Sequence, residues 1–113
     1  MPVSSLEEAA AAGGYECCTF RGSVVAFDAR TGKQLWKRYT IDQAPARVGT
    51  TRSGLSVIAP SGAAVWNSPT IDPKRGLLYV GTGDNYSEPT SDRSDAVIAM
   101  DLKTGEIRWS HQV

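Results

Sequence analysis

The sequence predicts an all-β fold, a fragment of about one and a half blades of a β-propeller. The first observation behind this prediction is an internal repeat: the pattern Ala-x-Asp-x-x-Thr-Gly-x-x-x-Trp occupies residues 26–36 and recurs 73 residues later at 99–109. The second is that both copies begin in short apolar, partly β-branched runs, which are typical of buried strands. The third is length, because a propeller closes with about four to eight four-stranded blades, and 113 residues supply fewer.

Each copy of the motif predicts a β-hairpin. A strand at 24–27 leads into an Asp that caps the turn and a Gly that closes it, since glycine adopts positive φ freely, and the chain returns at 34–39. The second copy repeats this arrangement with strands at 97–100 and 106–112. Because a hairpin cannot bury both faces alone, we expect the tryptophan of each copy to dock on a neighbouring repeat.

Residues 1–41 are predicted to form a partial blade with a short helical insert. Ser4 and Glu7, and equally Ser5 and Glu8, have the spacing of a capping box, and a run of alanines ended by two glycines follows. On the residue pattern alone, helix capping is the simplest role of the two glutamates.

The rest of the chain divides into a connection and one full blade. Residues 42–62 are rich in Gly, Ser, Thr, Pro and Arg without clean periodicity, which predicts an inter-blade connection. Residues 63–113 hold four strand candidates in order, which predicts one four-stranded blade. The first candidate runs from 63 to 71, and the second, at 77–81, follows a turn.

A long polar loop, 82–95, separates the second and third strands of this blade. Loops of this length in a compact repeat are often functional, and this one is rich in the hard oxygen donors that Ca²⁺ prefers. It lacks the ligand spacing of an EF-hand. The residues therefore leave two interpretations, a calcium-binding loop and a solvated polar loop.

The two cysteines of the chain, Cys17 and Cys18, are adjacent. They are either two buried thiols or a vicinal disulfide, which requires an oxidising compartment. Metal binding by this pair is not expected, because structural zinc needs four ligands and His111 is the remaining soft one. We expect His111 to be a strand residue without a chemical role.

Composition and charge argue against several functions. Lys and Arg number 12, as do Asp and Glu, and no basic run appears, so the sequence gives no indication of nucleic-acid binding. No apolar stretch approaches the length of a membrane span. The first four residues also lack the basic and hydrophobic regions of a signal peptide.

The repeated motif resembles the tryptophan-docking repeat of the quinoprotein alcohol dehydrogenases, eight-bladed β-propellers that use pyrroloquinoline quinone and calcium. Within this family, Trp-Asn-Ser-Pro-Thr-Ile-Asp at 66–72 and Leu-Tyr-Val-Gly-Thr-Gly-Asp-Asn-Tyr-Ser at 78–87 are similar to the branch that oxidises polyvinyl alcohol. The resemblance extends from Val3 to Trp109. It implies that the chain is a fragment of an eight-bladed propeller that binds this quinone.

The resemblance implies a first set of site residues around calcium. A Ser-Ser-x-x-Glu segment of the family supplies a hydroxyl to the quinone and a carboxylate to calcium, which corresponds to Ser5 and Glu8, with Glu7 as a one-place alternative. The family's calcium ligand is an Asn after a Thr-Gly pair; here Asp84 stands at that place, with the next residue, Asn85, as the alternative. Both are oxygen donors that calcium accepts.

A second set would hold the quinone itself. In the family a tryptophan forms the floor under the quinone and precedes the calcium ligand by eighteen places, the spacing of Trp66 and Asp84. A disulfide between adjacent cysteines covers the other face, which corresponds to Cys17 and Cys18, although in the methanol dehydrogenases these cysteines precede the calcium glutamate. An arginine that pairs with a quinone carboxylate corresponds to Arg21, and a surface ion pair is the alternative role of this residue.

The chemistry that the resemblance implies is the two-electron oxidation of an alcohol. Calcium polarises a quinone carbonyl, and a general-base aspartate takes the hydroxyl proton as hydride passes to the quinone. In the family that aspartate lies beyond the docking motif that Trp109 matches. We therefore expect the catalytic base outside this chain and no turnover by the chain alone. The resemblance also implies a periplasmic or secreted enzyme with cytochrome c as electron acceptor.

Two other function classes stay open on the sequence. A non-enzymatic propeller scaffold of the outer-membrane protein assembly type shares the docking repeat, but it has no use for Glu8, Trp66 and Asp84 in one place. A small interaction module would instead complete its propeller by self-association through an exposed apolar edge.

Overall fold

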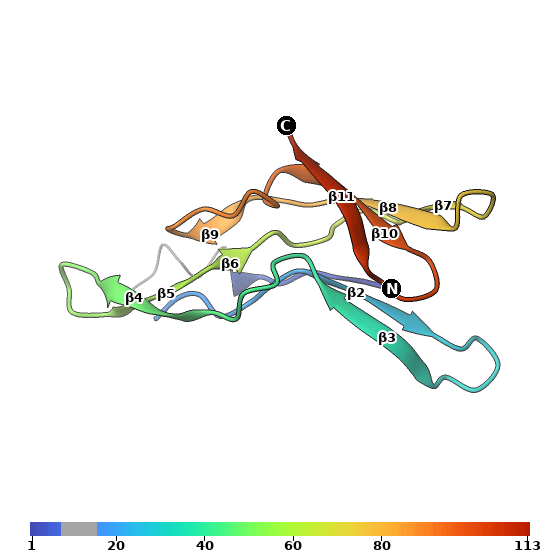
Figure 1. The fold of residues 1–113 in the computed structure, drawn as a ribbon. Helices are drawn as coiled ribbons and strands as arrows, with labels where there is room; N and C mark the ends of the chain where they lie inside the picture. The colour runs from blue at the N-terminus through green and yellow to red at the C-terminus, as the bar shows by residue number, and fades with distance from the viewer. Residues whose placement is uncertain (8–15) are drawn as a thin grey trace.

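The computed structural model describes residues 1–7 and 16–113, and the elements identified in these residues are β-strands (Figure 1). The predicted all-β fold is therefore confirmed for them. The expected helical insert falls largely in 8–15, outside the described residues, as does Glu8. The strands are β1 (Pro2–Val3), β2 (Ser23–Phe27), β3 (Gln34–Tyr39), β4 (Ala46–Thr50), β5 (Ser56–Ala59), β6 (Ser61–Gly62), β7 (Thr70–Asp72), β8 (Leu77–Gly81), β9 (Asn85–Ser87), β10 (Ala96–Asp101) and β11 (Ile107–Gln112).

Four strands, β7, β8, β10 and β11, form one antiparallel sheet in that order. This is the up-and-down order of a propeller blade, in the region where the sequence predicts four strands. A smaller sheet, β1-β2-β3, holds the first copy of the repeated motif. In Figure 1 the two sheets lie next to each other at one end of an elongated molecule, whose principal extents are 51 × 32 × 20 Å.

The first strand of the four-stranded sheet is shorter than the sequence predicts. β7 begins at Thr70, whereas residues 63–65 are buried and form no strand. Ala63 has a φ of 48°, outside the range of a strand, and its N–H donates to the Asp84 carbonyl at 2.8 Å. The apolar run that suggested a strand from 63 onward is therefore buried coil, because its backbone bonds a different segment.

The two copies of the motif adopt one geometry. Trp36 pairs with Ala26 and Trp109 with Ala99, and each strand pair carries a β-bulge immediately after that alanine. In both turns the Asp side chain accepts backbone N–H bonds from the residues two and three positions later, and the closing glycines both have a φ of 72°. The predicted hairpins are confirmed.

Trp36 joins the two sheets. Its ring packs on Gly105, where a Cβ atom would come within 2.5 Å of the indole. The indole N–H donates to the Leu102 carbonyl at 3.3 Å, and Arg38 Nε donates to the Gly105 carbonyl at 3.0 Å. The prediction that the first tryptophan docks on the neighbouring repeat is therefore confirmed.

A small hydrophobic core lies between the sheets, and both sheets contribute to it. Val24 comes from β2, whereas Ile98 and Met100 come from β10. Trp36 packs against this core from the edge. The buried members are Val24, Val65, Leu78, Val80, Ala96, Ile98 and Met100.

The predicted connection, 42–62, contains strands that its composition does not reveal. β4 and β5 form a hairpin that projects at the end of the molecule opposite the two sheets (Figure 1). The short strand β6 pairs with β9. A β-bulge next to Gly49 interrupts β4, and it breaks the apolar alternation by which a strand is recognised in a sequence.

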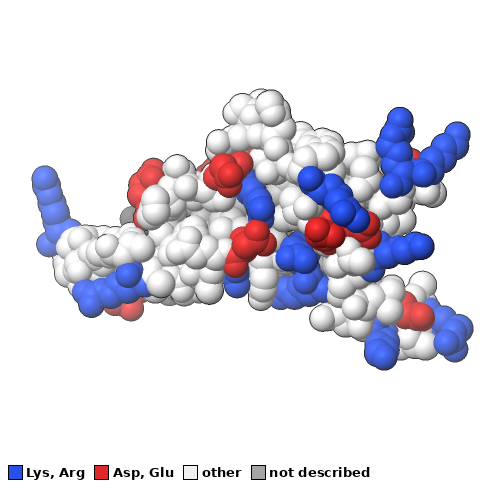
Figure 2. Space-filling model, viewed as in Figure 1, with Lys and Arg blue, Asp and Glu red and all other residues white. Residues whose placement is uncertain are grey.

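Acidic and basic side chains are interspersed over the middle of the face shown in Figure 2. Among the ion pairs are Arg93 with Asp42 at 2.7 Å and Arg108 with Asp101 at 2.8 Å. The described residues include no helix with the length and apolar character needed to cross a membrane.

Candidate cofactor site

Residues 57–66 form a central segment to which two other parts of the chain bond. Segment 17–22 runs parallel to it, and the Ile58 N–H donates to the Cys17 carbonyl at 3.0 Å. The segment that carries the predicted cysteines is therefore attached to the backbone that leads into Trp66.

The loop with the predicted calcium ligands bonds to the same central segment. The Gly83 N–H donates to the Ala64 carbonyl at 2.8 Å, and the Ala63 N–H donates to the Asp84 carbonyl at 2.8 Å. Strand β9, which starts at Asn85, pairs with β6. Three stretches that are far apart in the sequence, each with predicted site residues, thus share one backbone frame.

Glycines permit this close approach of backbones. A Cβ atom at Gly22 would overlap the Ala63 carbonyl oxygen, and one at Gly62 would lie 2.5 Å from the Asp84 carbonyl oxygen. Sequence reasoning did not single out either glycine. The available signal was the position of Gly22 directly after Arg21, a predicted site residue. Glycine is needed where two backbones touch, because it has no side chain.

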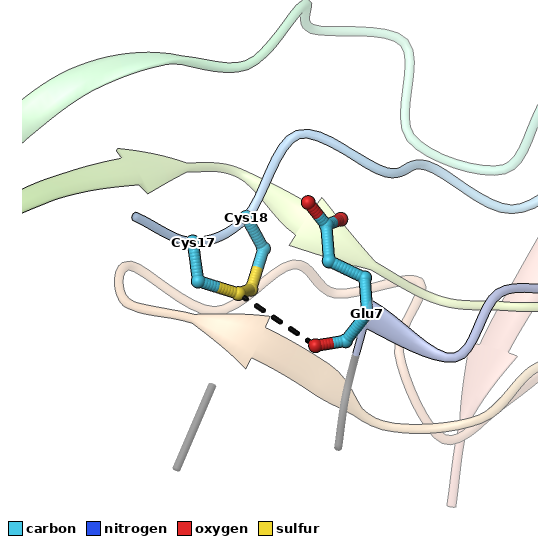
Figure 3. Close-up of side chains that lie close together, drawn as sticks. All are labelled: Glu7, Cys17 and Cys18. Carbon is cyan, nitrogen blue, oxygen red and sulfur yellow. Dashed lines mark hydrogen bonds between the residues drawn. A yellow bond between two sulfur atoms is a disulfide. The ribbon is translucent and has the colours of Figure 1, made fainter. Parts of the chain in front are cut away.

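Cys17 and Cys18 form a vicinal disulfide, which decides between the two states that the sequence left open (Figure 3). The peptide bond between them is cis. Cys18 is fully buried, and Cys17 is half-buried. The Cys18 N–H donates to the Ile58 carbonyl at 3.4 Å, so the disulfide is fixed to the central segment from both of its residues.

Glu7 braces the segment that follows the disulfide. Its carboxylate accepts the Thr19 N–H at 2.9 Å, the Thr19 hydroxyl at 3.3 Å and the Phe20 N–H at 2.6 Å. The sequence pattern predicts a helix cap for this residue, pointing back to Ser4, and the structure shows a long-range contact instead. Two backbone N–H groups of a neighbouring segment are stronger partners for a carboxylate than one local amide.

A carboxylate oxygen of Glu7 and the sulfur atoms of Cys17 and Cys18 lie within 4.8 Å of one another, but these atoms do not form a metal site. Disulfide sulfurs carry no thiolate, which is the form of cysteine that binds metals. Figure 3 shows that the Glu7 carbonyl oxygen, not its carboxylate, faces the sulfurs, and that oxygen lies 3.9 Å from Cys17 Sγ. The cluster is a structural contact of the disulfide.

Ser5 forms a hydrogen bond with Glu7. Its hydroxyl oxygen accepts the Glu7 N–H at 3.0 Å and so orients the start of the following segment. Its predicted bond to a quinone stays a prediction.

Arg21 is held by the backbone and by an aromatic ring. Its Nη1 donates to the carbonyls of Ile41 and Asp42, both at 3.0 Å, and its guanidinium lies 3.9 Å from the centre of the Tyr39 ring. Within the part of the chain that the structure describes, Arg21 forms no ion pair. The alternative of a surface ion pair is therefore not what holds this side chain.

Trp66 presents a large exposed aromatic surface at the end of the central segment. It is 56% exposed, and its Nε1 would lie 2.9 Å from a Cβ atom at Gly83. The next residue, Asn67, accepts the Gly81 N–H on its side-chain oxygen at 3.0 Å, which ties this segment to the end of β8. A fixed aromatic face of this kind suits stacking against a planar ring.

Asp84 and Asn85 differ in their surroundings. Asn85 is engaged inside its loop, since Nδ2 donates to the Ser87 carbonyl and Oδ1 accepts the Ser91 N–H at 3.3 Å. Asp84 is exposed, and its carboxylate makes no hydrogen bond or ion pair with the other residues that the structure describes. Of the two, Asp84 has the carboxylate available for an ion.

The loop is anchored by Arg93, which sequence reasoning missed. Arg93 Nη1 donates to the Thr40 carbonyl at 3.1 Å and to the Asp42 carboxylate at 2.7 Å. A pocket of about 430 Å³ lies beside this ion pair, between 41–48, 59–60 and 89–93. None of the predicted quinone-binding residues lines it. No pattern in the sequence marks Arg93, because its partners lie about fifty residues away.

Two carboxyl groups in the turns of the repeated motif have lowered pKa values. The side-chain hydrogen bond from Arg108, with backbone N–H bonds from Thr104 and Lys103, lowers the pKa of Asp101 to about 2. Backbone N–H bonds also lower the pKa of Asp28 in the first copy of the motif. These carboxylates stabilise the docking hairpins. His111 lies in β11, paired with Val97, and takes no part in the site.

The sequence profile of the glucose/ethanol/alcohol dehydrogenase β-propeller domain, a PQQ family, matches residues 8–113. Polyvinylalcohol dehydrogenase from a Pseudomonas species is 48% identical over 114 residues, which cover 100% of this chain and 18% of the relative. The protein of the same name from Sphingopyxis sp. (strain 113P3) is 47% identical, with 100% of this chain and 17% of the relative covered. The chain thus spans less than a fifth of the length of these relatives.

Solved structures show the same architecture. Quinohemoprotein alcohol dehydrogenase ADHIIG from Pseudomonas putida HK5 superposes with a TM-score of 0.59 at 27% identity, covering 82% of this chain and 16% of that one. The quinohemoprotein alcohol dehydrogenase of Comamonas testosteroni superposes with a TM-score of 0.56 at 23% identity, covering 81% and 17%, and supports the fold. The predicted fold, a fragment of a β-propeller, is confirmed.

Proposed function

Because the chain belongs to the family of pyrroloquinoline quinone-dependent alcohol dehydrogenase propellers, we propose that it supplies part of the quinone site of an enzyme that oxidises an alcohol. Its identity of 48% and 47% to two polyvinylalcohol dehydrogenases supports polyvinyl alcohol as the class of substrate. The same matches disfavour a non-enzymatic scaffold of the outer-membrane protein assembly type.

One observation carries this proposal: the central segment 57–66 bonds both to the disulfide segment and to the loop of Asp84. The residues on this frame suit the quinone chemically. Trp66 offers an exposed aromatic face for a planar ring, the Cys17–Cys18 disulfide is uncharged, and Arg21 carries the positive charge that quinone carboxylates require.

Trp66, the disulfide, Arg21 and Ser5 are the residues that would hold the quinone. Trp66 would orient its ring, and the disulfide would cover it from water. Arg21 and Ser5 would fix its polar edge by charge and by a hydroxyl donor. When bound, the quinone supplies the acceptor for the two electrons that the alcohol loses.

The proposal includes one residue from each of the two alternative pairs of calcium ligands. Asp84 would be the calcium ligand rather than Asn85, because the Asn85 amide oxygen already accepts the Ser91 N–H. Glu8 would be the ligand rather than Glu7, because the Glu7 carboxylate accepts the N–H groups of Thr19 and Phe20. Carboxylate oxygens are the ligands that calcium prefers.

The whole enzyme needs parts that this chain does not carry. The general base would come from another blade, so the 113-residue chain with quinone and Ca²⁺ should reduce no dye in the presence of alcohols. Cytochrome c would accept the electrons, a proposal supported by the name of a relative that is 31% identical, the lupanine 17-hydroxylase [cytochrome c] of a Pseudomonas species. A vicinal disulfide fits an oxidising compartment, which supports a periplasmic or secreted location.

A chimera tests the proposal. Residues 1–113 would replace the 114 matching residues of the Pseudomonas polyvinylalcohol dehydrogenase, which leaves the rest of that enzyme intact. The chimera should oxidise polyvinyl alcohol only with quinone and Ca²⁺. Trp66→Ala should abolish quinone binding measured by equilibrium dialysis.

The calcium assignment has a matched control in the same loop. Asp84→Ala should raise the Ca²⁺ concentration that the chimera needs for half-maximal activity at least tenfold, whereas Asp92→Ala, a change at another exposed aspartate, should leave that concentration unchanged. A folded chimera that binds no quinone, or equal effects of the two aspartate changes, would contradict the proposal.

A further inference from the structure

The pocket beside the ion pair of Arg93 and Asp42 has no role in the quinone site proposed above. Its volume of about 430 Å³ lies within the range of about 300–1,000 Å³ that is usual for ligand pockets. Three segments that are distant in the sequence line it, 41–48, 59–60 and 89–93. A cavity on which separate segments converge is a candidate binding site.

One wall of this pocket is apolar. Ile41 and Ala59 are buried, as is Pro60 next to them in the lining. Val48, on β4, continues the wall and is 52% exposed. Because an exposed apolar side chain gains free energy when it is covered, this wall favours a ligand with methylene groups.

The pocket also has polar side chains that are free to bind a ligand. Gln43 and Thr90 line it and are exposed, and their side chains make no hydrogen bond with the other residues that the structure describes. A side-chain amide and a hydroxyl group can each donate and accept a hydrogen bond. A ligand hydroxyl, which also does both, matches these two groups.

The charges of the lining disfavour an ionic ligand. Arg93 is the cation of the lining, and its Nη1 lies 2.7 Å from the Asp42 carboxylate. Asp92 adds a second carboxylate. An anion would therefore find no uncompensated positive charge, and a cation would meet the Arg93 guanidinium. An uncharged ligand avoids both conflicts and loses no ionic hydration when it binds.

Hydrogen bonds hold the walls in place. Arg93 Nη1 also donates to the Thr40 carbonyl at 3.1 Å, and the Arg93 carbonyl accepts the Thr82 hydroxyl at 2.6 Å. These bonds fix the segment 89–93 against the segment that begins at Ile41. A preformed pocket has less conformational entropy to lose on binding.

The pocket adjoins the frame of the candidate quinone site. Arg21 donates to the carbonyls of Ile41 and Asp42, both at 3.0 Å, and these two residues line the pocket. Ala59, on the opposite side of the lining, belongs to the central segment 57–66 that bonds the disulfide segment. The pocket and the predicted quinone residues thus share backbone, so an extended ligand can contact both.

We propose that this pocket binds a segment of polyvinyl alcohol next to the hydroxyl group that is oxidised. The polymer is uncharged, and it alternates methylene groups, which fit the apolar wall, with secondary hydroxyls, which Gln43 and Thr90 can bond. Its chain must leave the pocket at both ends, and the exposure of Val48 and Thr90 shows that the lining is open to solvent. The choice of polymer rests on the proposed function, but binding in the pocket requires no quinone.

Calorimetric titration of the chain with a short polyvinyl alcohol, without quinone, tests the apolar wall. The wild-type chain should bind the polymer. Val48→Glu should weaken binding roughly tenfold or more, because the polymer would displace water from a carboxylate. Thr50→Glu is the matched control, since Thr50 is an exposed residue of the same strand outside the lining. Circular dichroism establishes that each variant is folded.

The polar groups have their own test. Gln43→Leu and Thr90→Val should each weaken binding several-fold, because each removes a partner of the polymer hydroxyls. Gln34→Leu, the same change at an exposed residue outside the pocket, should have no effect. Polyethylene glycol of equal length, which has no hydroxyl along its chain, should bind much more weakly than polyvinyl alcohol. Equal affinity for the two polymers would overturn the proposal, as would a folded wild-type chain that binds neither.

Kinetics of the chimera separate this inference from the proposed function. Val48→Glu should raise KM for polyvinyl alcohol roughly tenfold at unchanged kcat, and it should leave the oxidation of butan-2-ol, too short to reach the pocket, unchanged. A chimera that neither binds quinone nor oxidises butan-2-ol would contradict the proposed function, while polymer binding by the chain would still be measurable. Equal KM values for the polymer in Val48→Glu and Thr50→Glu chimeras that oxidise butan-2-ol would overturn the inference about the pocket alone.

Discussion

Trp36 occupies the space that a side chain on Gly105 would need. A Cβ atom at that glycine would come within 2.5 Å of the indole ring, and the indole N–H donates to the carbonyl of Leu102 in the same turn. The contact links the two copies of the motif, so the tryptophan of one copy and the glycine of the other depend on each other.

Gly105→Ala should destabilise the chain more than the equivalent change in the first copy. We expect a loss of roughly 2–4 kcal/mol in the free energy of unfolding, because a left-handed backbone strains an L residue and the methyl group overpacks the joint. Gly32→Ala has the same φ of 72° but open space, so about 1 kcal/mol from strain alone is expected. Urea unfolding of dilute samples measures both, and equal losses would contradict the docking role of Gly105.

Gly22→Ala should disturb the candidate site through its backbone. The new methyl group would overlap the Ala63 carbonyl oxygen, which is itself held in the central segment. A loss of about 2 kcal/mol or more is expected. Gly49→Ala is the control, because Gly49 has no atom within 4 Å of its Cβ position, and it should change stability by less than about 0.5 kcal/mol. A neutral Gly22→Ala would show that the two segments separate easily in solution.

The docking hairpins could be predicted from the sequence because their determinants are local. Asp28 and Asp101 bond backbone amides two and three residues away, and both closing glycines have positive φ. The motif recurs after 73 residues, and this repetition predicts that one copy docks on the other. A short motif with fixed turn chemistry needs no distant partner to be recognised.

The site could be predicted only in part because its contacts are not local. Glu7 bonds Thr19 and Phe20, which lie twelve and thirteen residues away, and Arg93 bonds Thr40 at a separation of 53 residues. Nothing in the spacing of these residues indicates such pairs. The strand predicted over 63–71 begins only at Thr70 for the same reason, since the φ of 48° at Ala63 and its bond to the distant Asp84 carbonyl are not marked by the sequence.

Glu7→Ala should expose the disulfide to reduction. The change removes the acceptor of the Thr19 and Phe20 N–H bonds and loosens the segment that follows Cys18. We expect the rate of reduction by dithiothreitol, followed by mass spectrometry after alkylation, to rise several-fold. Glu16→Ala is the control, because Glu16 is exposed and the hydrogen bond that its carboxylate accepts from the Ser56 N–H is long at 3.4 Å. Equal rates for the two variants would show that Glu7 does not brace the disulfide.

Asp101 should make the stability of the chain depend on pH in the acid range. The Arg108 side chain lowers the pKa of the folded carboxyl from 3.8 to about 2. The ionised form therefore favours the folded state above about pH 4, and this contribution is lost as the pH falls towards 2. The carboxyl carbon of Asp101, followed by NMR, should titrate near pH 2 in the folded chain.

Arg108→Gln separates the two causes of this shift. The variant removes the side-chain hydrogen bond but keeps the backbone N–H bonds of Lys103 and Thr104, so the Asp101 midpoint should rise part of the way towards 3.8. The acid loss of stability should be smaller in this variant and should end at a higher pH, and it should be absent from Asp101→Asn. A midpoint that Arg108→Gln leaves unchanged would mean that the turn amides alone hold the carboxylate, and the pairing of Arg108 with Asp101 would then have no part in stabilising the docking hairpin.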